Sequence, residues 1–173
     1  MDYSLAARKA LTEAFEGLRL TAYPDPASGG DPWTIGYGHT GRDVVPGLVI
    51  TAQQADALLV ADIAAAIGAV RTQVKAPLTQ HQFDALVDFT FNVGAGNLQK
   101  SSLLRLVNAG LFAQADLEFA KWVKAAGKIM PGLVARRAGE AKWFATLDDT
   151  DPTPTGTVPD VEDPDDTEGA ERG

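Results

Sequence analysis

Two stretches of the sequence decide the fold: Phe15-Glu16-Gly17-Leu18-Arg19-Leu20-Thr21-Ala22-Tyr23-Pro24-Asp25 and, after a turn rich in glycine and proline, Trp33-Thr34-Ile35-Gly36-Tyr37-Gly38-His39-Thr40. They place two carboxylates, a hydroxyl and a glycine-rich β segment within residues 16–40. Hydrolysis of a glycosidic bond requires a proton donor at the leaving oxygen and a second group that handles water or the sugar cation. Glu16 and Asp25 are therefore candidates for these two tasks.

The sequence on either side of Glu16 predicts a change from helix to sheet. Residues 4–15 have apolar side chains at helical spacing, and Ser4 is a candidate N-cap. Glu16 then lies at or just past the helix C-terminus, where the negative pole of the helix favours the protonated acid. Residues 18–48 consist of short β-prone pieces separated by turn signals, which predicts a small antiparallel sheet.

The remainder of residues 1–147 is predicted to be helical. Thr51 with Gln54 forms a capping box that opens a long helix to about Arg71, and Thr79 with Gln82 opens a second, buried helix that ends near Gly94. Shorter helices are expected over 101–108, 112–123 and 131–147. The expected fold class is α+β and predominantly helical, with a small antiparallel β lobe joined to a larger helical lobe.

Length and composition predict one domain with an appendage. The chain has 173 residues, of which 45% are hydrophobic, which suits a single core over residues 1–147. Residues 148–173 hold ten acids and one base and almost no large apolar side chains, so we expect a disordered acidic C-terminal tail, either a solubilising segment, a linker or a functional arm. There is no cysteine, and the first 20 residues contain no apolar run that predicts a signal peptide.

Three motifs resemble one known family. Glu-Gly-Leu-Arg-Leu (16–20), Ala-Tyr-Pro-Asp (22–25) and Thr-Ile-Gly-Tyr-Gly-His-Thr (34–40) closely resemble the signature of the phage-type lysozymes, the endolysins that cut bacterial cell walls. The resemblance covers most of residues 4–147 and implies a lysozyme-like fold. It also implies that Glu16 is the general acid, Asp25 the second carboxylate and Thr34 the hydroxyl that helps to hold the attacking water. Direct attack by that water implies inversion at the anomeric carbon.

One departure from the family pattern makes Asp31 a rival for Asp25. Eight residues separate Asp25 from Thr34, about three more than is common in the family. Asp25 keeps the family spacing from Glu16 and follows Ala22-Tyr23, whereas Asp31 lies between Gly30 and Pro32, where aspartate commonly forms turns. We therefore assign the second carboxylate to Asp25 and leave Asp31 as the alternative.

Glycines and the end of the buried helix supply the candidate substrate-binding residues. Gly36 and Gly38 alternate with Ile35 and Tyr37, which predicts either a strand face open to a sugar polymer or a strand bend. The resemblance places Phe91 and Asn92 at the lining of the cleft, with Asn92 near an N-acetyl group and Phe91 alternatively in the core. Gly38, Phe91 and Asn92 are therefore the predicted substrate-binding residues.

An arginine and a histidine complete the predicted site. The resemblance places Arg136 or Arg137 near the catalytic acid, where a cation lowers the pKa of that acid; we assign this tuning role to Arg136. Asp62 borders the apolar face of the long helix and requires a cationic partner, so we predict that it pairs with His39 and ties the two lobes together. The chain has two histidines and no cysteine, so a histidine-based zinc site would need several carboxylates to complete it, and we expect no metal site.

These inferences predict a cofactor-free, monomeric endolysin that hydrolyses the β-1,4 bond between N-acetylmuramic acid and N-acetylglucosamine of peptidoglycan. We expect it to bind no nucleic acid, to have no stable membrane association, and to stay in the host cytoplasm until a phage-made membrane lesion releases it to the cell wall. Two alternatives remain: a lytic transglycosylase, for which Asp25 is dispensable, and a non-catalytic wall-binding or virion module on the same fold.

Overall fold

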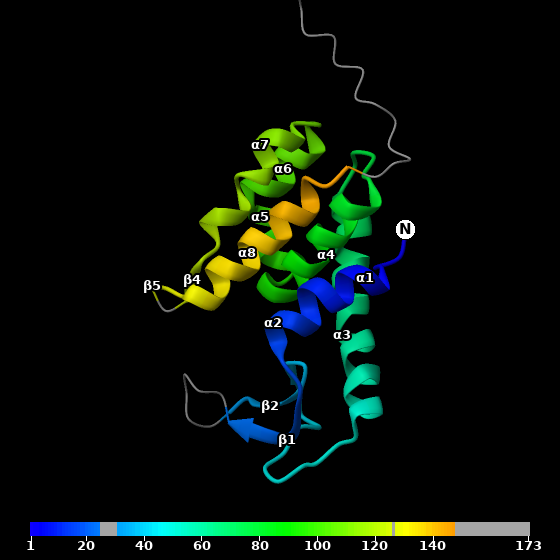
Figure 1. Ribbon diagram of the computed structural model, residues 1–173, viewed down its shortest axis with the longest axis vertical. Coiled ribbons are helices and arrows are strands. Elements are labelled where there is room, and N and C mark those ends of the chain that lie inside the picture. Colours follow the sequence, from blue (N-terminus) through cyan, green and yellow to red (C-terminus); the bar gives the residue numbers. More distant parts are fainter. Residues whose placement is uncertain (25–30, 126, 148–173) are drawn as a thin grey trace, which may run out of the picture.

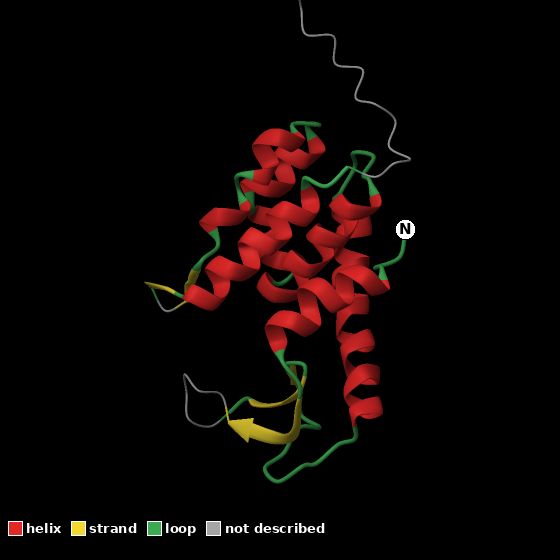
Figure 2. Ribbon diagram, viewed as in Figure 1, coloured by secondary structure: helices red, strands yellow, loops and turns green. Residues whose placement is uncertain are grey.

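The computed structural model describes residues 1–24, 31–125 and 127–147, and these residues form two lobes. Helices build the larger lobe and a three-stranded sheet the smaller one, while helix α3 (Ala52–Gln73) runs from one to the other (Figure 1). Figure 2 shows how completely strands and helices are separated, apart from a short hairpin beside the helices. The predicted tail, 148–173, and Asp25 lie outside the described residues.

The N-terminal helix is continuous but not regular. It consists of α1 (Leu5–Ala7), a π-helical segment η1 (Arg8–Glu13) and α2 (Ala14–Glu16). The hydroxyl of Ser4 accepts a hydrogen bond from the Ala7 N–H at 3.1 Å, as its predicted N-cap role requires. The helix ends at Gly17, whose φ is 68°. Glycine adopts such a positive φ without the steric strain that a side chain would cause. The helix was predicted in the right place, whereas its wide π turn was not predicted.

The small sheet has the strand order β1-β2-β3 and is antiparallel throughout. Its strands are β1 (Arg19–Pro24), β2 (Trp33–Gly36) and β3 (His39–Thr40), with an irregularity in the pairing between Arg19 and Tyr23. Ile35 is fully buried and packs with Ala22 and Val44 in a small core of this lobe. Because side chains alternate along a strand, Thr34 lies on the opposite face from Ile35.

Two capping boxes start the two main helices, as predicted. In α3 the Thr51 side chain accepts from the Gln54 N–H while the Gln54 side chain accepts from the Thr51 N–H, and the same exchange at Thr79 and Gln82 opens α4 (Gln80–Val93). Helix α4 is buried at every position from 83 to 90. It ends at Gly94 with φ 87° and ψ 151°, so the glycine is required but the predicted left-handed cap is not the conformation it adopts.

The last third of the described chain departs most from the prediction. Helix α5 (Ala95–Lys100) was not predicted; α6 (Ser102–Asn108) was. The helix expected over 112–123 is two pieces, α7 (Phe112–Asp116) and η2 (Phe119–Lys121). A hairpin of β4 (Lys124–Ala125) and β5 (Lys128–Ile129) then precedes α8 (Pro131–Phe144), which ends three residues earlier than expected. Strands of two residues carry no detectable alternation, which is why the hairpin was missed.

Helix α4 lies at the centre of the larger lobe, between α3 and α8 (Figure 1). Its Phe89 is fully buried and meets the rings of Phe119 and Trp122 edge-on, at centroid distances of 5.5 and 5.4 Å. Each buried aromatic of this kind contributes about 1.5–3 kcal/mol. Over the described part of the chain, no helix combines the length and hydropathy needed to cross a membrane. Because α8 packs against α4, Arg136 of α8 lies close to Glu16 at the end of the N-terminal helix.

Candidate active site

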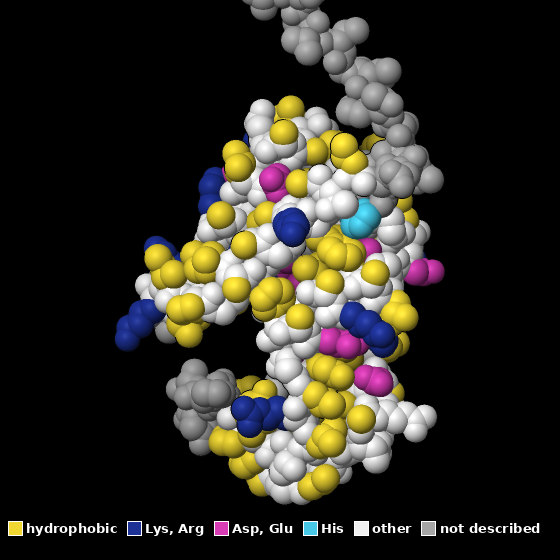
Figure 3. Space-filling view, viewed as in Figure 1, with side chains coloured by type: hydrophobic (Ala, Val, Ile, Leu, Met, Phe, Trp, Pro, Cys, Tyr) yellow, Lys and Arg dark blue, Asp and Glu magenta, His cyan; other side chains and the backbone are white. Residues whose placement is uncertain are grey.

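A cavity of about 480 Å³ opens between the two lobes, where the surface is visibly hollowed (Figure 3). Elements from both lobes line it: the end of α2, the segment around β3, the middle of α3, and the junction of α4 and α5. Its lining consists of Glu16, Gly38, Thr40, Ala61, Asp62, Ala65, Ala66, Thr90, Phe91, Asn92, Gly94 and Ala95. The predicted residues Glu16, Gly38, Phe91 and Asn92 thus share one cavity.

Glu16 is the last residue of α2, and its side chain is 21% exposed. Gly38 lies against it: a Cβ added to Gly38 would be 3.0 Å from Glu16 Oε2, and the φ of this glycine is 92°. Glycine at position 38 therefore leaves room for the Glu16 carboxylate, a role that the sequence pattern did not indicate. A side chain at position 38 would compete with the carboxylate for the same space.

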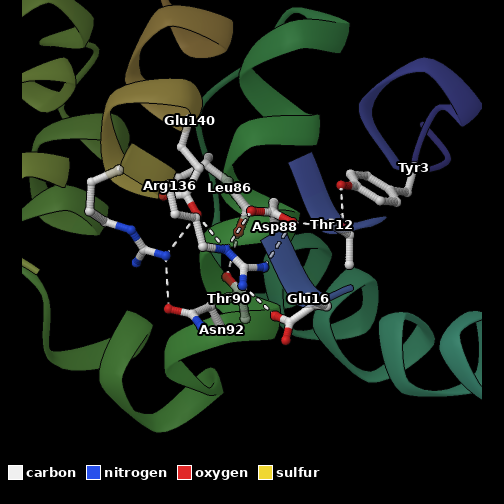
Figure 4. A network of polar contacts seen from close by, with 10 residues as sticks. Tyr3, Thr12, Glu16, Leu86, Asp88, Thr90, Asn92, Arg136 and Glu140 are labelled. Atoms are coloured by element: carbon white, nitrogen blue, oxygen red, sulfur yellow. Dashed lines mark hydrogen bonds and ion pairs between the residues drawn. The ribbon is translucent and has the colours of Figure 1, made fainter. Parts of the chain in front are cut away.

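Arg136 holds the Glu16 carboxylate from the protein side. Its Nη1 donates to Glu16 Oε1, while its Nε and Nη2 donate to the two carboxylate oxygens of Asp88, each at 3.1 Å (Figure 4). Burial alone would lower the pKa of Arg136, but the carboxylates of Asp88 and Glu16 outweigh that effect and raise it. Arg136 is therefore a fixed cation beside Glu16.

Arg137 shares Glu140 with Arg136, whose Nε lies 3.4 Å from Glu140 Oε1, but among the described residues Arg137 makes no hydrogen bond or ion pair with Glu16. Its Nη2 donates to Asn92 Oδ1 and to Glu140 Oε1, both at 2.8 Å. Glu140 is fully buried, and this burial raises the pKa of its carboxyl well above the usual value despite the nearby guanidinium of Arg137. Of the two candidate arginines, Arg136, to which we assigned the role, contacts Glu16, whereas Arg137 orients the amide of Asn92.

Thr34 and Asp31 are not among the residues that line the cavity. Thr34 pairs with Tyr23 and Thr40 in the sheet, and among the described residues it is Thr40, not Thr34, that lines the cavity with Glu16. Asp25 lies outside the described residues. Its rival Asp31 is exposed and borders a second cavity of about 540 Å³ on the β lobe.

His39 joins the sheet to helix α3. Its Nδ1 lies 2.8 Å from Asp62 Oδ2, and its Nε2 lies 3.2 Å from the exposed Asp43 Oδ2. Burial disfavours the charged ring, but hydrogen bonds with Asp62 and Asp43 outweigh burial and raise the pKa of His39. The other histidine, His81, is half-buried, with its ring edge-on to Trp143.

Phe91 and Asn92 occupy the end of α4, where the helix meets the cavity. Phe91 is half-buried and packs against the main core, and its ring centroid lies 6.0 Å from the Arg136 guanidinium carbon. It therefore contributes both to the core and to the lining of the cavity. Asn92 is exposed, with its amide held by Arg137. Across residues 1–24, 31–125 and 127–147, no group of three or more His, Cys, Asp or Glu side chains is arranged to hold a metal ion.

A model of the phage lysozyme family matches residues 13–140, a range that includes every cavity-lining residue. The chain belongs to the phage lysozyme family. The endolysin of Bacillus phage PZA is 48% identical over 134 residues, covering 78% of this chain and 52% of the relative. The endolysin of Acyrthosiphon pisum secondary endosymbiont phage 1 is 44% identical over 138 residues, covering 78% of this chain and 92% of the relative. The chain spans about half the length of the Bacillus phage endolysins it matches.

Solved structures give the same family and a lysozyme-like fold. The muramidase domain of SpmX from Asticaccaulis excentricus superposes with a TM-score of 0.77 at 39% identity, covering 84% of this chain and 99% of that domain. An endolysin from Escherichia coli O157:H7 phage FAHEc1 superposes with a TM-score of 0.75 at 38% identity, covering 84% of this chain and 94% of the other. The α+β, mostly helical fold class predicted from the sequence is confirmed.

The residues around Arg136 include three that sequence reasoning did not select: Asp88, Thr12 and Tyr3. The Thr12 hydroxyl donates to Asp88 Oδ1 at 2.7 Å, and Tyr3 Oη lies 2.8 Å from Thr12 Oγ1 (Figure 4). The sequence held a signal for Asp88, because it lies among the apolar residues 85–89 and a buried carboxylate requires a compensating cation or hydrogen bonds. The sequence did not specify which cation that would be.

Proposed function

We propose that this protein is a peptidoglycan hydrolase that cleaves the β-1,4 bond between N-acetylmuramic acid and N-acetylglucosamine, with Glu16 as the general acid. The single observation that carries the proposal is the position of the Glu16 carboxylate: it lines the cavity between the lobes, against Gly38 and in contact with Arg136. Relatives named endolysin and a solved muramidase domain support the same chemistry.

In the proposed reaction, Glu16 protonates the glycosidic oxygen of a glycan bound in the cavity. Asp25 stabilises positive charge on the sugar or polarises water, and Thr34 holds that water by accepting and donating hydrogen bonds. Attack of water on the face opposite Glu16 inverts the anomeric carbon. Gly38, Phe91 and Asn92 contact the glycan, Arg136 tunes the acid, and no step requires a cofactor.

The site of action we propose is the bacterial cell wall, and the proposed active form is a monomer. Endolysins that match this chain include several named SAR-endolysins, such as that of Bacteriophage PS119 at 35% identity over 128 residues. Passage to the wall through a phage-made lesion stays a prediction, as does the absence of nucleic-acid binding and of stable membrane association.

The test compares Glu16→Gln with Glu13→Gln on purified peptidoglycan. Glu13 lies one turn earlier in the same helix, pairs with Arg8 at 2.9 Å, and is not among the cavity-lining residues, so it is a matched control. We expect Glu16→Gln to lose about 100-fold or more of the rate at which reducing ends appear, because removing a general acid costs about 10²–10⁴-fold. Glu13→Gln should clear the wall at the parent rate.

Product analysis separates the proposed hydrolase from its alternatives. New reducing ends of inverted configuration, followed by NMR during the first turnovers, support direct attack by water. Anhydro sugars would identify a lytic transglycosylase, and wall binding without cleavage would identify a non-catalytic module. Asp25→Asn and Asp31→Asn, assayed side by side, decide which aspartate is the second carboxylate: only the Asp25 variant should lose turnover.

A further inference from the structure

Helix α4 carries two buried carboxylates one turn apart, Asp84 and Asp88, and they have different partners. Asp84 is 1% exposed and accepts hydrogen bonds from the Ser4 N–H at 3.0 Å, the Ser4 hydroxyl at 2.6 Å and the Gln80 amide at 2.8 Å. Asp88 is fully buried and accepts from Arg136 twice and from Thr12 once. Only Asp88 is therefore joined to the group that contacts Glu16.

Asp88 makes the two hydrogen bonds that orient the Arg136 guanidinium, while Glu140 Oε1 lies farther from its Nε, at 3.4 Å. Two parallel N–H bonds to one carboxylate fix the plane of a guanidinium as well as its position. The remaining Nη1 then points to Glu16 Oε1. Asp88 is not among the residues that line the cavity, so it acts on Glu16 only through Arg136.

The N-terminal helix contacts both Asp88 and Arg136. Thr12 and Glu16 are four residues apart, so both reach the same side of the helix; Thr12 bonds to Asp88 and Glu16 bonds to Arg136 (Figure 4). The Thr12 hydroxyl has a single proton, and it donates this proton in its hydrogen bond to Asp88. Tyr3 must then be the donor in its 2.8 Å contact with Thr12, which gives this chain of bonds a single direction.

We propose that Asp88 is a positioning residue of the active site, which fixes Arg136 so that Arg136 holds the Glu16 carboxyl in the orientation needed for proton transfer. The proposal rests on the proposed function of Glu16. Asp88 itself never touches the glycan. The consequence of losing it is a misplaced acid in a folded protein, and misplacement by about 1 Å can cost about 10²-fold in rate.

The test compares Asp88→Asn with Asp84→Asn on soluble peptidoglycan fragments, at a temperature well below both unfolding transitions. In Asp88→Asn the new NH₂ group faces an N–H of Arg136, so one of the two parallel bonds is lost. We expect kcat to fall about 10- to 100-fold with KM changed less than about threefold. Asp84→Asn loses a buried carboxylate of the same helix but keeps Arg136 in place, so its kcat should stay within about threefold of the parent.

A double substitution separates positioning from general destabilisation. If Asp88 acts through Arg136, adding Asp88→Asn to Arg136→Lys should lower kcat by less than about twofold further. If the Asp88 variant fails to fold, Thr12→Val replaces it, because this change removes one of the bonds that orient Asp88 and keeps the volume; Thr12→Ser should restore kcat. Equal losses in Asp88→Asn and Asp84→Asn, or full additivity with Arg136→Lys, would overturn the proposal.

A readout that does not depend on turnover keeps this inference distinct from the proposed function. Hydrogen exchange of the Arg136 Nε–H, followed by NMR, should be at least about tenfold faster in Asp88→Asn and unchanged in Asp84→Asn. A parent protein that leaves peptidoglycan intact contradicts the proposed function, and the exchange rates then decide by themselves whether Asp88 holds Arg136. Unchanged exchange in Asp88→Asn would overturn the inference even in an active enzyme.

Discussion

The ring of His39 and the carboxylate of Asp62 lie 2.8 Å apart, and this contact joins strand β3 to helix α3 across the two lobes. Because Asp62 also lines the cavity, the contact fixes one wall of the site. The strength of the contact depends on the charge of His39, so its contribution to the free energy of unfolding varies with pH.

Replacing Asp62 with asparagine should destabilise the protein more at low pH than at high pH. The pKa of His39 is raised in the folded state, so its contribution is fully present below the unfolded pKa near 6.5 and is lost as pH rises through the folded pKa. We expect Asp62→Asn to cost about 1–3 kcal/mol at about pH 5.5 and less at about pH 8.5, measured by urea unfolding. Asp43→Asn, which removes a partner that is 65% exposed, should cost less at both pH values.

Replacing Gly38 with alanine should reduce activity beyond its effect on stability. The new Cβ would lie 3.0 Å from Glu16 Oε2, so the carboxylate must shift, and we expect kcat to fall about tenfold or more. Gly47→Ala is the matched control: Gly47 has a similar φ of 79° but no atom within 4 Å of an added Cβ. Both variants should lose about 1–2 kcal/mol from backbone strain, whereas only Gly38→Ala should lose turnover. Equal kcat values in the two variants would contradict the proposed contact.

Replacing Tyr3 with phenylalanine should remove part of the loss of stability at alkaline pH. Burial and the nearby Asp88 raise the pKa of Tyr3, so the contribution of Tyr3 is present below about pH 10, where the unfolded phenol titrates, and declines above it. We expect Tyr3→Phe to cost about 1 kcal/mol at about pH 8, through loss of the bond to Thr12, and less at about pH 10.5. Unfolding by urea at both pH values checks the sign.

Replacing Arg136 with methionine should destabilise the fold strongly as well as impair the site. The change leaves the fully buried Asp88 without its cation, and breaking a buried pair in this way costs about 3–5 kcal/mol. Arg8→Met removes a partly exposed pair with Glu13 and should cost about 1 kcal/mol or less. Thermal and urea unfolding of the two variants would contradict this account if the losses were equal.

Local signals predicted most of the fold because they act within a few residues. Thr51 and Thr79 start helices through hydrogen bonds to residues three positions later, and Gly94 ends a helix through its own backbone angles. The π segment Arg8–Glu13 and the two-residue strands of the β4–β5 hairpin depend on packing from distant parts of the chain. Neither has a periodicity that a single sequence displays.

Four residues selected from the sequence, Glu16, Gly38, Phe91 and Asn92, line one cavity, whereas the contacts that hold them were less predictable. The motif around Glu16 and Gly38 identified two groups that the structure brings into contact, and the spacing of Asp62 on its helix led to His39. The buried carboxylate Asp88 and the choice between Arg136 and Arg137 depend on how α8 packs against α4. That packing joins residues 48 positions apart, for which the sequence holds no local signal.

Glu16 and Arg136 are separated by 120 positions along the chain, yet each depends on the other. A nascent polypeptide that has left the ribosome only as far as α7 contains the acid but lacks the guanidinium that orients it. Contacts so distant in sequence require a long loop to close, which costs more chain entropy than a local contact does. If Glu16 is the general acid proposed above, the site becomes complete only after α8 has been synthesised and has packed against α4.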